Sequence, residues 1–126
     1  MKIKFLLLIG LVFLSFSCNK DDDTLADKIA GTYQGNFWSY AVSENLEATA
    51  IVKKTGDEMV SIEISSATSQ FEKIFVTQIP LVEYHDDSIN QDVISLNKLH
   101  ELDGAFYERN KDLSLSVYNK GWFQKN

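Results

Sequence analysis

Alternation of apolar and polar residues at every second position most constrains the fold of this chain. Val60, Ile62 and Ile64 alternate with polar neighbours, and the same rhythm occurs at 46–54 and 113–117. Because side chains two residues apart lie on one face of a strand, this pattern predicts half-buried β-strands. No long amphipathic helix pattern follows the first twenty residues. The chain is therefore predicted to be all-β.

The strands are expected to be short and spaced about ten residues apart, which is typical of antiparallel all-β folds. Pro80 is expected to end a strand or to mark a sheet edge. We predict a small antiparallel up-and-down β-barrel, with a β-sandwich as the alternative. One helical turn from Leu25 to Ala30 is expected to precede the strands, because Thr24 and Asp27 have the spacing of a capping box. Seven or eight strands are expected, among them 31–41, 46–54, 59–65, 71–79, 93–99, 105–109 and 113–117.

The first 17 residues have the composition of a secretion signal. Lys2 and Lys4 precede a predominantly apolar run at 5–16. This run has the length of a signal-peptide core and is shorter than the ~20 apolar residues that span a bilayer. Residues 1–17 are therefore predicted to be a signal peptide and the remainder to be exported.

Charge and cysteine content limit the bonds that the exported part can form and the classes of partner that it can bind. The chain has one cysteine, so no intrachain disulfide can form. Removing residues 1–17 leaves 10 Lys plus Arg against 18 Asp plus Glu, a formal charge of −8. This balance argues against binding nucleic acid or an anionic membrane surface. The remaining length suits one domain, expected at 25–126.

The segment Leu14-Ser15-Phe16-Ser17-Cys18 resembles a bacterial lipoprotein signal. Asn19-Lys20-Asp21-Asp22 is similar to the surface-export signal of lipoproteins of the Bacteroidota. This resemblance implies fatty acylation of Cys18 (palmitate or a similar chain), an acidic tether at 18–24, and attachment to the outer membrane with the domain at the cell surface. The alternative is an ordinary secretory signal followed by an unmodified Cys18.

Residues 27–35 resemble the start of small lipocalin-like, or calycin-like, lipoprotein domains. There a helical turn leads through Gly-x-Trp into the first strand, and the aromatic ring plugs the barrel base. Gly31 and Tyr33 take those places here, with Tyr in place of Trp. The arginine that packs on this ring in the family would have to be Arg109, the single Arg of the chain. The resemblance implies a barrel that either holds an open cavity or is filled by its own side chains.

Catalytic and metal-binding patterns are weak. His85-Asp86-Asp87 and His100-Glu101 are the groupings of histidine with carboxylates, and each has the composition of a solvated turn. A metal site needs three or four converging ligands, and a nucleophile needs an activating base. We therefore expect no catalytic residues, no metal and no cofactor.

Two binding modes remain open. In the first, a small apolar ligand enters the barrel, or the domain acts as an envelope scaffold. In the second, outward aromatic residues bind a protein or a glycan without an internal cavity. Trp38 and Tyr40 would serve the second mode unless a bulge near Ser39 turns them inward or a loop covers them. The residues expected to line a cavity are Tyr33, Phe37, Ala48, Ala50 and Ile62.

Overall fold

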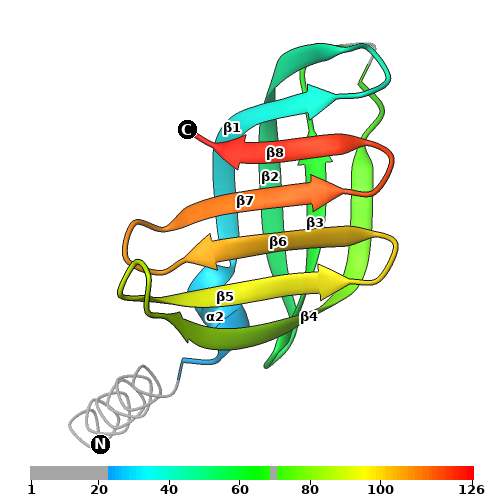
Figure 1. Ribbon diagram of the computed structural model, residues 1–126. Coiled ribbons are helices and arrows are strands. Elements are labelled where there is room, and N and C mark those ends of the chain that lie inside the picture. The colour runs from blue at the N-terminus through cyan, green and yellow to red at the C-terminus, as the bar shows by residue number, and fades with distance from the viewer. Residues whose placement is uncertain (1–22, 69–70) are drawn as a thin grey trace, which may run out of the picture.

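The computed structural model describes residues 23–68 and 71–126, which form one closed barrel. The predicted signal peptide and Cys18 lie outside the described residues. Each strand pairs antiparallel with the next along the chain, and β8 pairs back onto β1 (Figure 1). The prediction of an up-and-down, lipocalin-like barrel is confirmed, and the closed ring excludes the β-sandwich alternative. The strands are β1 Gly31–Ser39, β2 Glu44–Gly56, β3 Met59–Ser65, β4 Ile74–Asp86, β5 Gln91–Lys98, β6 Leu102–Tyr107, β7 Asp112–Val117 and β8 Gly121–Lys125.

A short helix, α2 (Leu25–Ile29), closes one end of the barrel (Figure 1). The capping box is present: the Thr24 hydroxyl accepts a hydrogen bond from the Asp27 backbone N–H, and the Asp27 carboxylate accepts one from Thr24 N–H. The Tyr33 hydroxyl donates to the Ile29 carbonyl oxygen at 2.6 Å. This bond joins the end of the helix to the first strand.

Alternation along the strands sends large apolar side chains into the barrel. Phe37, Phe106 and Phe123 are the largest of the fully buried side chains. The rings of Tyr33 and Phe106 meet edge to face with centroids 6.2 Å apart, next to the helix. Tyr33 therefore lies at the plugged base, as the resemblance implied, with a phenylalanine as its aromatic partner.

The prediction that Pro80 ends a strand is wrong, because β4 runs through it from Ile74 to Asp86. The β3–β4 register shifts between Val60 and Ile62, and Gln78 has a positive φ of 56°. A bulge of this kind absorbs one extra residue and bends the strand. Pro80 then pairs with Met59, the first residue of β3, so its missing N–H falls at the end of that ladder.

Within residues 23–68 and 71–126, no helix is long and apolar enough to cross a membrane.

Candidate functional site

The residues predicted to line a cavity form part of a packed core. All five are buried, and all belong to one apolar cluster that runs through the barrel. The ring of Phe37 packs edge to face against that of Phe71 at 5.3 Å. The five residues are Tyr33, Phe37, Ala48, Ala50 and Ile62.

Three glycines show how closely this interior is filled. A Cβ added to Gly35 would lie 2.8 Å from the Phe123 ring, and one added to Gly104 would lie 2.8 Å from the Leu115 side chain. A Cβ at Gly121 would lie 2.9 Å from a ring carbon of Phe37. These distances are shorter than any ordinary carbon–carbon contact. At these places the interior has no space for one more methyl group.

An open hollow of about 410 Å³ lies at the end of the barrel where β1 ends, away from α2, which precedes the start of that strand. Its apolar floor includes Phe37, Phe71 and Ile74, and Tyr40 stands at its margin. One predicted ligand residue, Phe37, therefore lines a hollow, although at the mouth of the barrel. The remaining lining residues are Ser39, Ala41, Glu72, Asn119 and Lys120.

Trp38 and Tyr40 belong to an aromatic cluster on the outside of the barrel. Trp38 lies opposite Trp122 on the neighbouring strand, and their rings stack with centroids 5.9 Å apart and planes 26° apart. Tyr40 meets Trp122 edge to face at 5.8 Å. Tyr40 and Trp122 are 52% and 47% exposed, so the bulge or loop that would have hidden Tyr40 is not found. We call Trp38, Tyr40 and Trp122 the aromatic cluster.

Beside this cluster, a second hollow of about 390 Å³ lies on the outer face of β4 to β8. We call it the outer groove. Its centre carries small side chains, while Trp122 stands at one side and Tyr84 and Tyr107 at the other. The lining residues are Tyr84, Ser95, Asp103, Gly104, Ala105, Tyr107, Ser114, Leu115, Ser116 and Trp122.

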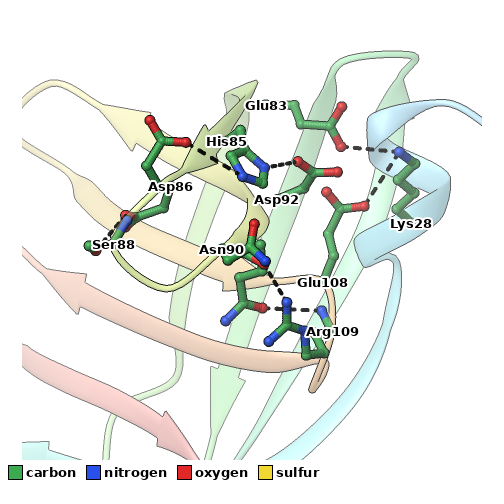
Figure 2. Close-up of polar contacts among 11 residues, drawn as sticks. Lys28, Glu83, His85, Asp86, Ser88, Asn90, Asp92, Glu108 and Arg109 are labelled. Carbon is green, nitrogen blue, oxygen red and sulfur yellow. Dashed lines mark hydrogen bonds and ion pairs between the residues drawn. The ribbon is translucent and has the colours of Figure 1, made fainter.

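A third group, of charged side chains, lies at the rim beside α2 (Figure 2). Lys28 of the helix places Nζ 3.1 Å from Glu83 Oε2 and 3.4 Å from Glu108 Oε1. Glu83 continues the inward row of β4, and Glu108 that of β6, beyond the last apolar side chain of each row. The ammonium group thus joins the helix to both strands.

The two carboxyl groups bind protons differently. Burial, followed by the hydrogen bond and negative charge of Glu83, raises the pKa of Glu108. The hydrogen bond from Glu108, followed by that from Lys28, lowers the pKa of Glu83. The Glu108 Oε2 atom is buried and has no hydrogen-bond partner. Glu108 therefore releases its proton at a higher pH than an ordinary glutamate does, and Glu83 at a lower pH.

The rim group has some of the geometry of a metal site. Carboxylate oxygens of Glu83, Asp92 and Glu108 lie within 4.8 Å of one another. However, the Lys28 ammonium lies against two of them, and His85 Nδ1 lies 2.9 Å from Asp92 Oδ1. The cation that balances these carboxylates is thus a lysine of the chain itself, and we assign no metal to them.

The predicted histidine groups are not brought together. His85 lies at the end of β4, beside the β4–β5 turn, and His100 lies in the β5–β6 turn. Successive hairpin turns are at opposite ends of their shared strand, so β5 separates the two. Arg109, which the resemblance would place on Tyr33, instead donates a hydrogen bond to the Asn90 carbonyl oxygen at the rim (Figure 2).

Replacing Glu108 by Gln is expected to raise the melting temperature at pH 7 and to leave it unchanged near pH 4. The raised pKa of Glu108 means that its protonated form stabilises the fold below the ordinary value of 4.5, and this stability is lost as the pH rises through the folded pKa. Gln keeps a donor for Glu83 and never ionises. The gain at pH 7 should be at most about 1 kcal/mol, as expected for a partly exposed charge pair.

Thermal unfolding followed by circular dichroism between pH 4 and pH 8 tests this expectation. The exposed Glu44, at the start of β2, provides a matched control in Glu44→Gln, which makes the same substitution at a site exposed to solvent. A difference in melting temperature between Glu108→Gln and the native chain that is equal at pH 4 and pH 7 would contradict the raised pKa of Glu108.

Searches of protein-family models, of curated proteins and of solved structures find no match to this chain.

Proposed function

We propose that this protein is an exported, lipid-anchored binding module of the bacterial cell surface, and that it binds its target on the outside of a filled barrel. The observation that carries the proposal is the half-exposed aromatic cluster of Trp38, Tyr40 and Trp122. Large rings exposed together on a small domain are typical of a binding surface. The filled interior favours this mode over a ligand held deep in the barrel.

The position of the proposed lipid anchor, Cys18, supports binding on the outside of the barrel. Cys18 precedes the helix cap Thr24 by six residues, so the acidic tether reaches at most about 20 Å when extended. The helix end of the barrel would therefore lie near the membrane. β1 runs from the helix toward Trp38 and Tyr40, and eight steps of roughly 3.3 Å place them on the order of 25 Å further on. The aromatic cluster would then face away from the membrane.

A small apolar ligand at the barrel mouth is the second candidate. The hollow of about 410 Å³ over Phe37, Phe71 and Ile74 favours it. In this mode the ligand would cover the mouth instead of entering the barrel. It predicts that Ile74→Glu abolishes capture of a small hydrophobic compound from envelope extract, while the aromatic cluster is dispensable.

The double variant Trp38→Ala with Tyr40→Ala tests the proposal. We expect at least a tenfold loss of binding to envelope material prepared from the producing bacterium, measured by biolayer interferometry with the anchored chain. Tyr118→Ala, which removes an exposed ring from the β7–β8 turn, is the matched control. Because Trp38 is half-buried, Tyr40→Ala alone is measured as well, with circular dichroism to check folding. Full binding by both folded variants would refute the proposal.

A further inference from the structure

We infer that the target is a carbohydrate, and that one or two of its sugar rings bind in the outer groove beside the aromatic cluster. This inference rests on the proposed function and names the class of ligand. The groove provides the two kinds of contact that a sugar ring needs. These are an aromatic face against which its C–H groups pack, and short polar side chains that exchange hydrogen bonds with its hydroxyl groups.

The strand register creates the floor of the groove. Ser95, Ala105 and Ser114 are cross-strand partners across β5, β6 and β7, and all three are outward-facing. Asp103 and Ser116 form the next row, which ends at Trp122 on β8. Small side chains in two adjacent rows leave the hollow, and their hydroxyl and carboxylate groups line it.

The aromatic walls of the groove are held in place. Trp122 stacks on Trp38 and is met by Tyr40, so its ring is fixed before any ligand binds. On the opposite side, Tyr84 and Tyr107 are the two cross-strand partners of Val93. Val93 is fully buried but lies outside the core cluster, as expected if neighbouring rings cover it from the outside. Preorganised walls lower the entropic cost of binding.

The composition of the groove favours a neutral carbohydrate over other ligands. Its lining residues include one carboxylate, Asp103, and no lysine, arginine or histidine. An anionic ligand would therefore find no positive partner there. An extended peptide could not add a strand beside the groove, because the described strands close into a ring without a free edge. β2 and β3 contain no aromatic residue, and the exposed ring of Phe75 on β4 lies outside the groove.

Chemical treatment of the envelope material distinguishes carbohydrate from protein. Periodate cleaves the vicinal diols of sugars, whereas a broad protease removes protein. We expect binding of the anchored chain to survive protease treatment and to be lost after periodate. The reverse result, binding lost to protease and resistant to periodate, would overturn the inference while leaving the proposed function intact. Absence of any binding to untreated material would overturn both.

Two variants place the sugar in the groove. Trp122→Ala removes one wall and Ser114→Leu fills the floor, and each should weaken binding to protease-treated envelope material at least tenfold. Trp122→Phe should restore part of the binding. The matched controls are Tyr118→Ala and Ser65→Leu, the latter an outward serine on β3. Each variant is first shown to melt as cooperatively as the native chain. Undiminished binding by folded Ser114→Leu and Trp122→Ala would exclude the groove.

Discussion

Gly121→Ala is expected to prevent the barrel from closing, or to destabilise it by about 3–5 kcal/mol, the combined size of backbone strain and overpacking. Gly121 has a φ of +144°, a backbone conformation that residues other than glycine rarely adopt. A Cβ placed there would lie 1.8 Å from the Trp38 carbonyl oxygen. Because this oxygen belongs to the backbone of β1, relief of the clash would require the paired strand itself to move.

The position of Gly121 makes this effect large. It pairs with Ser39 on β1 and with Val117 on β7, so it belongs to the seam at which the last strand meets the first. This pairing joins residues about eighty positions apart. If it fails, β1 and β8 each expose an unpaired edge, and the core opens along one side.

Urea unfolding followed by fluorescence of the two tryptophans measures the effect at the seam itself, because both rings lie on it. Gly56→Ala is the matched control, since a Cβ there meets only the Met59 side chain, at 3.5 Å. The urea midpoint of Gly56→Ala should differ little from that of the native chain. A native midpoint for Gly121→Ala would mean that β8 is not held against β1 as described.

Much of the local structure could be predicted because it depends on neighbouring residues. The Thr24 capping box produced the expected helix, which ends at Ile29. Alternation predicted the bounds of β3, Met59–Ser65, as the structure has them. Pro80 misled the prediction because the bulge that accommodates it depends on pairing with β3.

The binding surface was only partly predictable. Alternation alone placed Trp38 on the outer face, but its partner Trp122 is 84 positions away and is set beside it by barrel closure. The outer groove also depends on register across five strands, β4 to β8, to which no local motif points. The outward-facing serines of β7, Ser114 and Ser116, were the sequence feature that could have indicated a polar surface there. Likewise, Glu83 and Glu108 lie together at the rim because of barrel closure and the position of Lys28, which pairs with both.

Phe106→Ala is expected to destabilise the barrel by about 3–5 kcal/mol, the usual result of truncating a buried phenylalanine. Phe106 is 2% exposed, its ring meets Tyr33, and its cross-strand partners Ile94 and Leu113 are fully buried. Close neighbours on every side limit collapse around the truncated side chain, so the variant should contain a void. The matched control is Phe75→Ala, which removes a phenyl ring from an outward position that is 60% exposed. It should lower the free energy of unfolding far less.

The effect of indole on the melting temperatures of the native chain, Phe106→Ala and Phe75→Ala shows whether the native barrel is filled or has room for a ligand. Apolar voids bind small aromatic molecules, and a ligand that binds only the folded state raises the melting temperature in proportion to its occupancy. We therefore expect indole to stabilise Phe106→Ala and to leave the native chain and Phe75→Ala unchanged. If indole stabilised the native chain as much as Phe106→Ala, the barrel would already contain room for a ligand. The case for binding on the outer face would then lose the premise that the interior is closed.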